Sequence, residues 1–226
     1  MQAYGRDRGR GSAPPSAAGR HSSRRGRASR RIILFLAVAL ALALPAVALS
    51  ASVKIRVEGK TKNLFAPTEV TVTANTALDA LEQASILGEL YYHVTVTGFG
   101  PYVDQVGRYG GSGSSGWVFK VDDVSPPVGA DKVTLKDGDH VLWYYADFGP
   151  NGGPPTLKLT STAGGCYVAQ ALDDNGKPAT VSNLVIHVGS SRTMAARTGQ
   201  KVCPGAHKGL LIRATADGAV RSNALE

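Results

Sequence analysis

Apolar and polar residues alternate in the first segments that are able to form strands. Residues 53–58 (VKIRVE) and 69–73 (EVTVT) place apolar side chains at every second position, and a period of two is typical of half-buried strands. The stretch between them begins at Gly59 and ends at Pro67, both of which favour turns. The pattern therefore predicts a hairpin or two neighbouring strands.

The period changes at Thr76, where helix-forming residues begin. Residues 76–87 contain leucines and alanines that give a modest apolar face. Thr76 can cap the first turn, and Asp79 follows three residues later, as in a capping box. Gly88 is placed to end the helix. One helix is therefore predicted here, the only clear one that the pattern indicates beyond residue 52.

Three further strands are predicted after this helix, at residues 91–97, 117–121 and 140–146. The glycine-rich residues 98–116 between the first two are expected to form a loop. Two strands, one helix and three strands indicate an α+β fold, in which the helix packs on a mixed sheet; a β-grasp-like module is its commonest small form. We assign this module to residues 53–149.

A change of composition separates a second module. Residues 150–155 (PNGGPP) have the composition of a linker. Residues 156–226 repeat short apolar runs and turn residues without a helical period, which predicts a small all-β sandwich of immunoglobulin-like or prealbumin-like type.

The positive charge of the chain is confined to its beginning. The formal net charge is +8, and residues 1–31 hold nine arginines and one acidic residue, Asp7. The remaining residues carry equal numbers of basic and acidic side chains. A neutral body argues against a nucleic-acid-binding protein, which needs a basic face for phosphates. Residues 1–31, rich in Arg, Ser and Gly, are expected to be disordered.

An apolar run follows the arginines directly. Residues 32–50 form an apolar core, broken at Pro45, and then small residues that fit cleavage after Ala48 or after Ser50. These features predict a signal peptide, and the alternative is an uncleaved anchor. Residues 29–31 (SRR) resemble a twin-arginine signal, although the Leu- and Ala-rich core favours the general secretory route. Either way the body is expected to be secreted or displayed at the cell surface.

The two cysteines, Cys166 and Cys203, lie in this exported body. Export favours a disulfide between them. The alternatives are free buried thiols or a cysteine nucleophile, for which His207 is the only histidine close in sequence to serve as the base.

Motifs for catalysis or metal binding are weak. Residues 111–116 match the glycine spacing of a dinucleotide fingerprint, but a strand is predicted to follow where that mechanism needs a helix; we expect a loop tip or a loop that orders over a ligand. The histidines have no metal-ligand spacing, and residues 173–176 (DDNG) favour a turn over a calcium loop. Without a serine-nucleophile elbow either, the sequence predicts no enzyme and no metal.

Aromatic side chains offer the better candidate site. Strand alternation turns Trp117, Phe119, Trp143 and Tyr145 inward, whereas Tyr102 lies in the expected loop. Tyr92 and Tyr144 are expected to be exposed with Tyr102. The candidate ligand-binding residues, able to stack on a flat ligand, are Tyr92, Tyr102, Trp117 and Tyr144.

The first module resembles the transcobalamin-like C-terminal domain family in the order and spacing of several blocks. These are residues 76–84 (TALDALEQA), 100–103 (GPYV), 116–122 (GWVFKVD), 129–130 (GA) and 136–141 (KDGDHV). The resemblance implies a β-grasp-like fold and a corrinoid or cobalamin-type ligand. Vertebrate cobalamin carriers pair this domain with a large helical barrel, for which the sequence pattern predicts no counterpart in this chain. Residues 213–223 resemble the closing strands of bacterial surface immunoglobulin-like repeats and imply a spacer or an adhesion role.

These observations lead to one hypothesis and one alternative. The chain is expected to be an exported, non-catalytic binding protein for a small ligand or a surface protein. The alternative is a structural or adhesion protein of the cell surface without a small-molecule site. An aromatic cleft beside residues 98–116 would favour binding, and a flat polar surface there would favour the alternative.

Overall fold

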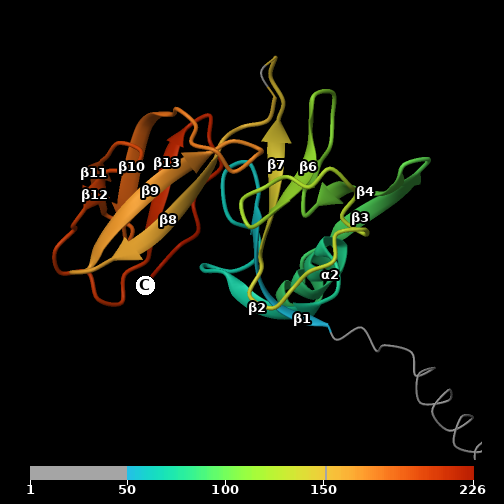
Figure 1. Ribbon diagram of the computed structural model, residues 1–226, viewed down its shortest axis with the longest axis horizontal. Helices are drawn as coiled ribbons and strands as arrows, with labels where there is room; N and C mark the ends of the chain where they lie inside the picture. Colours follow the sequence, from blue (N-terminus) through green and yellow to red (C-terminus); the bar gives the residue numbers. More distant parts are fainter. Residues whose placement is uncertain (1–49, 151) are drawn as a thin grey trace, which may run out of the picture. The chain divides into compact units, whose positions relative to one another are not determined.

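The computed structural model describes residues 50–150 and 152–226 (Figure 1). In this part of the chain it contains one helix, one mixed sheet and several antiparallel sheets, which confirms the α+β class. The predicted disordered segment and nearly all of the predicted signal peptide, up to residue 49, lie outside the described residues. Within them, no helix has the length and apolar character to cross a bilayer.

A four-stranded mixed sheet carries the first module, in the order β2-β1-β7-β6. β1 pairs in parallel with β7, and the other two pairings are antiparallel. β6 is therefore an edge strand of this sheet. The bounds are β1 (Ala51–Glu58), β2 (Val70–Ala74), β6 (Ser115–Val121) and β7 (His140–Asp147).

The helix α2 (Ala77–Gly88) begins as the sequence predicts. The Thr76 hydroxyl accepts a hydrogen bond from the Asp79 N–H, and the Asp79 carboxylate accepts one from the Thr76 N–H, each at 3.1 Å. The end differs from expectation, because Glu89 takes the left-handed conformation and Gly88 remains helical. A Cβ on Gly88 would lie 2.6 Å from the Phe65 ring, so close packing requires this glycine.

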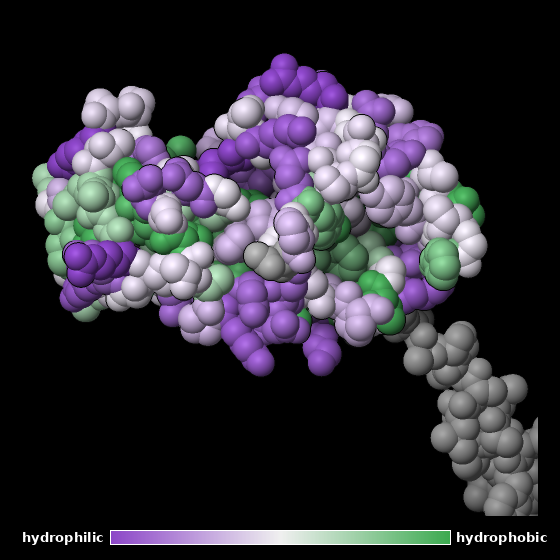
Figure 2. All heavy atoms as spheres, turned by 90° about the horizontal axis from the view of Figure 1, so that it is seen from above, coloured by the Kyte–Doolittle hydropathy of each residue, from purple (hydrophilic) through white to green (hydrophobic). Residues whose placement is uncertain are grey.

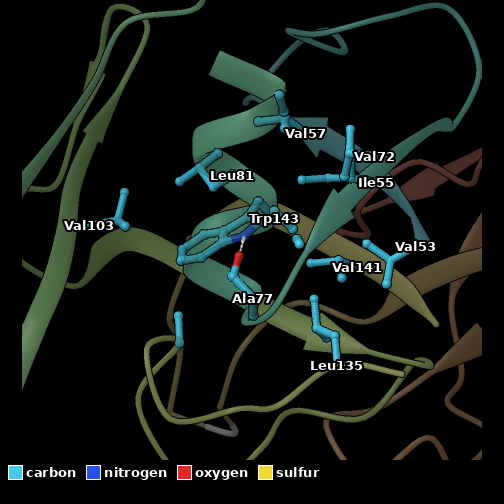
Figure 3. Packing of buried hydrophobic residues seen from close by; sticks show 14 of the residues in the cluster. Val53, Ile55, Val57, Val72, Ala77, Leu81, Val103, Leu135, Val141 and Trp143 are labelled. Carbon is cyan, nitrogen blue, oxygen red and sulfur yellow. Dashed lines mark hydrogen bonds between the residues drawn. The ribbon is translucent and has the colours of Figure 1, made fainter. Parts of the chain in front are cut away.

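The core of the first module lies between α2 and the sheet (Figure 3). Every second residue of β1, namely Val53, Ile55 and Val57, is fully buried there. The Trp143 indole of β7 lies among them and donates a hydrogen bond to the Ala77 carbonyl at 3.0 Å. This bond satisfies the indole N–H and joins the start of α2 to the sheet.

The prediction of a continuous loop over residues 98–116 is wrong. Most of this stretch belongs to strands, and a separate antiparallel sheet has the order β3-β4-β5. Its glycines mark the turns: Gly98 lies at the β3–β4 tip, and Gly107, with φ of 56°, lies between β4 and β5. The strands are β3 (Tyr92–Thr97), β4 (Gly100–Val106) and β5 (Tyr109–Gly110).

The second module consists of two three-stranded antiparallel sheets, β12-β9-β8 and β11-β10-β13, around an apolar core. This arrangement is consistent with the predicted sandwich. The strands are β8 (Thr156–Thr162), β9 (Cys166–Leu172), β10 (Ser182–Val188), β11 (Arg192–Ala195), β12 (Lys201–Val202) and β13 (Ile212–Asp217). The division of the chain into separate domains, joined by a linker at 150–155, stays a prediction.

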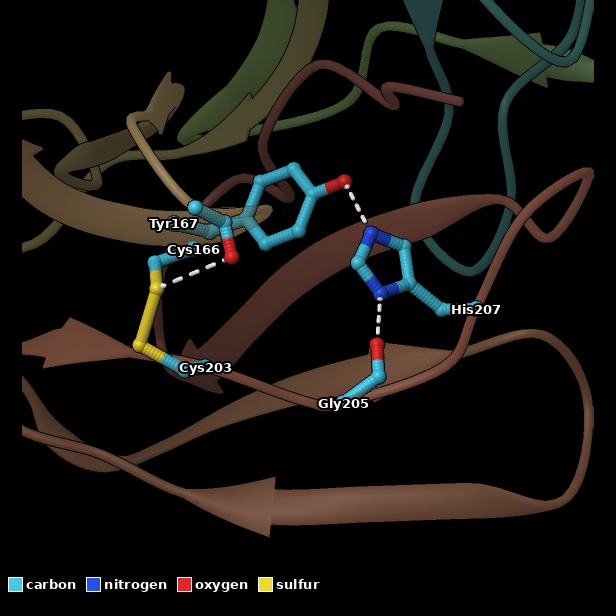
Figure 4. Close-up of a disulfide and its surroundings, with 6 residues drawn as sticks. Cys166, Tyr167, Cys203, Gly205 and His207 are labelled. Carbon is cyan, nitrogen blue, oxygen red and sulfur yellow. Dashed lines mark hydrogen bonds between the residues drawn. A yellow bond between two sulfur atoms is a disulfide. The ribbon is translucent and has the colours of Figure 1, made fainter.

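The predicted disulfide between Cys166 and Cys203 is present (Figure 4). It joins the start of β9 to the residue after β12. Nearby, the Tyr167 hydroxyl and His207 Nε2 are 2.8 Å apart. Because both sulfur atoms are bonded to each other, neither is available as the nucleophile that we considered with His207.

A third apolar cluster connects the two modules. Leu142, Tyr144 and Ala146 lie on the face of β7 opposite Trp143 and pack with Val220 of the second module. Residue 157 donates its backbone N–H to the Val220 carbonyl at 2.9 Å, which holds Val220 beside the start of β8. Both faces of β7 are thus covered, which explains its nearly unbroken apolar sequence.

Buried ionic groups accompany this contact. Glu58, fully buried at the end of β1, accepts hydrogen bonds from Arg221 at 2.7 and 3.0 Å. Arg56 and Arg213 lie 3.6 and 3.7 Å from the same carboxylate. One carboxylate therefore balances arginines from both modules.

Removal of the disulfide is expected to destabilise the second module selectively. Cys203→Ser opens a loop that spans 37 residues in sequence, and the chain-entropy model gives about 3–4 kcal/mol for such a cross-link. Hydrogen exchange with increasing denaturant should show that loss in β8–β13 and a smaller one in β1 and β7. The Cys166→Ser/Cys203→Ser double variant should match the single variant. Equal losses in both modules would contradict the predicted domain boundary.

Neutralising Glu58 is expected to destabilise the whole described body. Glu58→Gln removes the buried charge to which Arg221 donates and which Arg56 and Arg213 approach, and breaking a buried ion pair in this way typically costs about 3–5 kcal/mol. Urea unfolding should show a loss of this size. Glu82→Gln, on the exposed face of α2, is the matched control and should change stability by about 0.5 kcal/mol or less. Equal effects of the two variants would show that the Glu58 carboxylate contributes little.

Candidate functional site

A cleft of about 310 Å³ lies along the edge strand β6. Trp117, Val118 and Phe119 all line it, although neighbouring residues of a strand point to opposite faces. Because Val118 points to the face opposite Trp117 and Phe119, the cleft is lined from both faces of the sheet at the β6 edge. The opposite wall is the beginning of β4, residues 101–103.

The walls of the cleft are mainly apolar and aromatic. The rings of Phe119 and Trp143 are stacked with centroids 5.1 Å apart, and Trp117 meets Tyr145 edge to face at 5.7 Å. The Trp117 indole donates to the Tyr109 carbonyl at 2.7 Å. Because partners inside the protein already hold these rings in place, the wall is rigid before any ligand arrives.

The cleft has one polar end, at Asp174. The Ser125 hydroxyl donates to the Asp174 carboxylate at 3.2 Å, and the Tyr144 hydroxyl lies 3.5 Å from the same oxygen. Burial, together with the nearby Asp174 carboxylate, raises the pKa of Tyr144, so its hydroxyl stays protonated. Asp174 comes from the β9–β10 loop, so the second module completes a site that begins in the first.

The structure brings together three of the four predicted ligand-binding residues. Tyr102, Trp117 and Tyr144 all line the cleft. Tyr92 does not; it is half-buried and packs against the core of the first module.

The expectation that Tyr144 is exposed is wrong. Alternation correctly places it on the opposite face from Tyr145, but the second module covers that face, and Tyr144 is 2% exposed. Trp117, also 2% exposed, forms a wall of the cleft. Tyr102 is 45% exposed and is the most accessible of the candidate residues.

Sequence reasoning missed Phe148, Pro126 and Asp174, which also line the cleft. Phe148 lies two residues before the predicted linker, and Asp174 belongs to the predicted turn at residues 173–176 of the other module. Their position depends on contact between modules, for which the sequence pattern carries no signal.

A second hollow, of about 680 Å³, is larger but differs in character. It is lined by charged side chains, including Lys60, Asp147 and Arg221, and by turn residues of the second module. The Lys60 ammonium lies 4.6 Å from the centre of the Tyr145 ring. Binding sites typically combine an apolar wall with few polar groups, which favours the cleft beside β6.

Exposed apolar side chains occur at several separate places on the surface. On the face in Figure 2, hydrophobic side chains gather in several places that hydrophilic side chains separate. The most exposed large apolar residues are Phe99 and Val96, at and beside the tip of the β3–β4 hairpin. This tip is a second surface able to contact a partner.

The other candidate motifs have local structural roles. Residues 111–116 form a tight turn in which Ser112 and Ser115 exchange backbone hydrogen bonds, and they lead into β6 instead of a helix. The Asp173 carboxylate accepts backbone N–H groups from Asn175 and Lys177, as expected for a turn. Within residues 50–150 and 152–226, no cluster of three metal-binding side chains occurs.

The histidines of the first module pair with carboxylates. His93 Nδ1 lies 2.7 Å from Asp104, and His140 Nδ1 lies 3.0 Å from Glu69. The hydrogen bond to Glu69 raises the pKa of His140 above its ordinary value of 6.5. Burial acts to raise the pKa of Glu69, but the bond to His140 and the charge of Arg56 outweigh burial and lower it.

Comparison with known families supports the sequence resemblance in part. Residues 74–147 match the model of a family described as a domain of unknown function (DUF4430), which is found in transcobalamin-like bacterial proteins. The match begins at the last residue of β2 and ends at the last residue of β7. No curated protein matches the chain.

The His140–Glu69 pair is expected to make stability depend on pH. Because the pKa of His140 is raised in the folded protein, its contribution to stability is fully present below pH 6.5 and is lost as the pH rises through the raised pKa. Because the pKa of Glu69 is lowered, its contribution is fully present above pH 4.5 and is lost as the pH falls through the lowered pKa. The thermal midpoint difference between the wild type and His140→Gln should therefore be largest between 4.5 and 6.5. Adding Glu69→Gln to His140→Gln also removes the contact of Glu69 with Arg56 at 3.7 Å, so a further loss is expected, but that further loss should not change as pH rises through the raised pKa of His140, because Arg56 stays charged. A difference independent of pH would contradict this account.

Proposed function

We propose that this protein is an exported, non-catalytic binding protein whose cleft along β6 holds a ligand. The observation that carries the proposal is the cleft itself, in which Tyr102, Trp117 and Tyr144 meet around about 310 Å³. Ligand-binding clefts typically begin at about 300 Å³ and combine apolar walls with a few convergent polar groups. The Asp174 end supplies such groups.

The fold of each module is consistent with a binding protein. We propose that the first module is β-grasp-like, because its single helix covers a mixed sheet in which the first and last strands pair in parallel. The second module is proposed to be immunoglobulin-like. It supplies Asp174 to the cleft, so its role extends beyond that of a spacer.

A corrinoid is the ligand class that the family resemblance implies. The cleft is at the small end of ligand sites, so it would hold one edge or one side group of a corrinoid and leave the remainder outside. Smaller ligands with one apolar ring and one hydrogen-bond donor fit the site better, because Asp174 offers acceptor oxygens at one end only.

The alternative function is adhesion or structural support at the cell surface. It is favoured by the exposed Phe99 and Val96 at the β3–β4 tip. Such a surface suits contact with another macromolecule and needs no cleft.

The proposal is tested by equilibrium dialysis of the full chain against cobalamin and cobinamide, with Trp fluorescence as a second readout. Cleft binding predicts micromolar retention and a change in tryptophan emission, because Trp117 and Trp143 both line the cleft. Tyr102→Ala should weaken retention about tenfold, a loss of about 1.4 kcal/mol of contact. Tyr91→Ala is the matched control, because Tyr91 is exposed but does not line the cleft.

The outcomes separate the two functions. Retention that Tyr102→Ala weakens about tenfold and Tyr91→Ala leaves unchanged supports the cleft as the site. Retention that both tyrosine variants leave unchanged places corrinoid binding elsewhere and contradicts the proposal. No retention removes corrinoids as ligands of this cleft.

A further inference from the structure

The outer edge of β6 is open in the middle and closed at both ends. At one end, Ser115 exchanges both of its backbone hydrogen bonds with Ser112, each at 2.9 Å. At the other end, Val121 does the same with Val124, at 2.9 and 3.0 Å. Both end residues therefore direct their backbone groups away from β7, into local turns.

Strand alternation fixes where the intervening groups point. Because Ser115 and Val121 face away from β7, the N–H and C=O groups of Trp117 and Phe119 face the same way. Among the described residues, no backbone or side-chain partner pairs with these groups. The edge thus presents two donors and two acceptors at strand spacing, and they face the cleft.

The opposite wall of the cleft has a similar opening. β5 pairs only with Gln105 and Val106 of β4. The earlier residues of β4, at 101–103, have a strand partner on the β3 side alone. The cleft therefore lies between the unpaired edges of two different sheets.

We propose that the occupant of this cleft is an extended polypeptide segment of a partner protein, which adds as a strand to β6 at Trp117–Phe119. This inference rests on the proposed function and names the ligand class of that site. Unpaired N–H and C=O groups at strand spacing are complementary to another polypeptide backbone in β conformation. A flat ring could stack on the walls, but it would leave these backbone groups without partners.

The walls define the side chains of the segment. Residues of an added strand point alternately to the two faces of the sheet. In the cleft they would meet apolar lining residues, among them Pro101, Ala130, Pro126 and Phe148, with Asp174 at the polar end. The segment should therefore carry apolar side chains on both faces and one neutral hydrogen-bond donor near Asp174, because the Lys120 ammonium, 3.5 Å away, already matches the charge of that carboxylate.

The same walls favour one extended peptide segment over the sheet edge of a second copy of this protein. Tyr102 lies across β6, with its hydroxyl 2.6 Å from the position that a Cβ of Gly116 would take. Residues 101–103 of β4 and Phe148 line the same space. A single extended segment needs less room between these walls than the edge of a second folded sheet.

The test uses the full chain and a random linear dodecapeptide library displayed on phage. Peptides that bind are synthesised, and their affinities are measured by fluorescence anisotropy. Strand addition predicts that N-methylation at alternate peptide positions weakens binding at least tenfold, whereas methylation at the intervening positions changes it less than twofold. Hydrogen exchange should show new protection of the Trp117 and Phe119 amides, which exchange rapidly without peptide.

A pair of variants isolates the backbone contribution. Phe119→Pro removes one outward N–H and leaves the ladder with β7 intact, because that N–H does not point to β7. Phe119→Ala is the matched control for the lost ring. Binding should be at least tenfold weaker in the proline variant than in the alanine variant. If the proline variant fails to fold, the methylated peptides and the exchange data on the wild type decide the question.

Several results would overturn the inference. These are the recovery of no binding peptide, binding without alternation in the methylation series, and binding without protection of the two amides. Protection of Trp117 and Phe119 that grows with protein concentration in the absence of peptide would assign the edge to a second copy. Retention of a corrinoid or another small ligand in a Tyr102-dependent manner, without a peptide response, would leave the proposed function standing and remove the polypeptide ligand alone.

Discussion

The parallel pairing of β1 with β7 is the interaction on which the other features of the structure depend. It joins residues 54–58 to residues 140–144 in one register, across most of the first module. A parallel pair cannot close through a tight hairpin, so the intervening chain must cross over, and the helix α2 lies within that crossing. The pairing places Trp143 beneath the helix and leaves β6 at the edge of the sheet.

Burial of both faces of these central strands follows from this arrangement. One face of β7 carries Trp143 and Tyr145 into the first core, and the other carries Leu142 and Tyr144 against the second module. β1 behaves similarly, with valine and isoleucine on the helix side and the Arg56–Glu58 pair on the other. The polar side is buried with its charges matched by arginines of the second module, because an unmatched buried carboxylate would be costly.

The cleft is a consequence of where the sheets end. β6 has a partner on one side only, β4 belongs to another sheet, and the space between them is bounded by the β9–β10 loop that carries Asp174. Fixed rings on the walls and unpaired backbone groups along the edge give this space both shape and hydrogen-bonding capacity. Together they suit an occupant that is extended and partly apolar.

The sequence by itself determined the local elements of this protein. The start of α2, the alternating strands, the disulfide and the aromatic character of the site all follow from residue types at short spacing, since capping, pleating and thiol oxidation are local chemistry. The tertiary structure alone decided that Tyr144 is buried, that Tyr92 lies outside the cleft, and that residues 98–116 form strands between glycine turns. It also decided that Asp174 joins Tyr102 and Trp117, because burial and proximity depend on which distant segments pack together, and the period of a single segment cannot specify its partner.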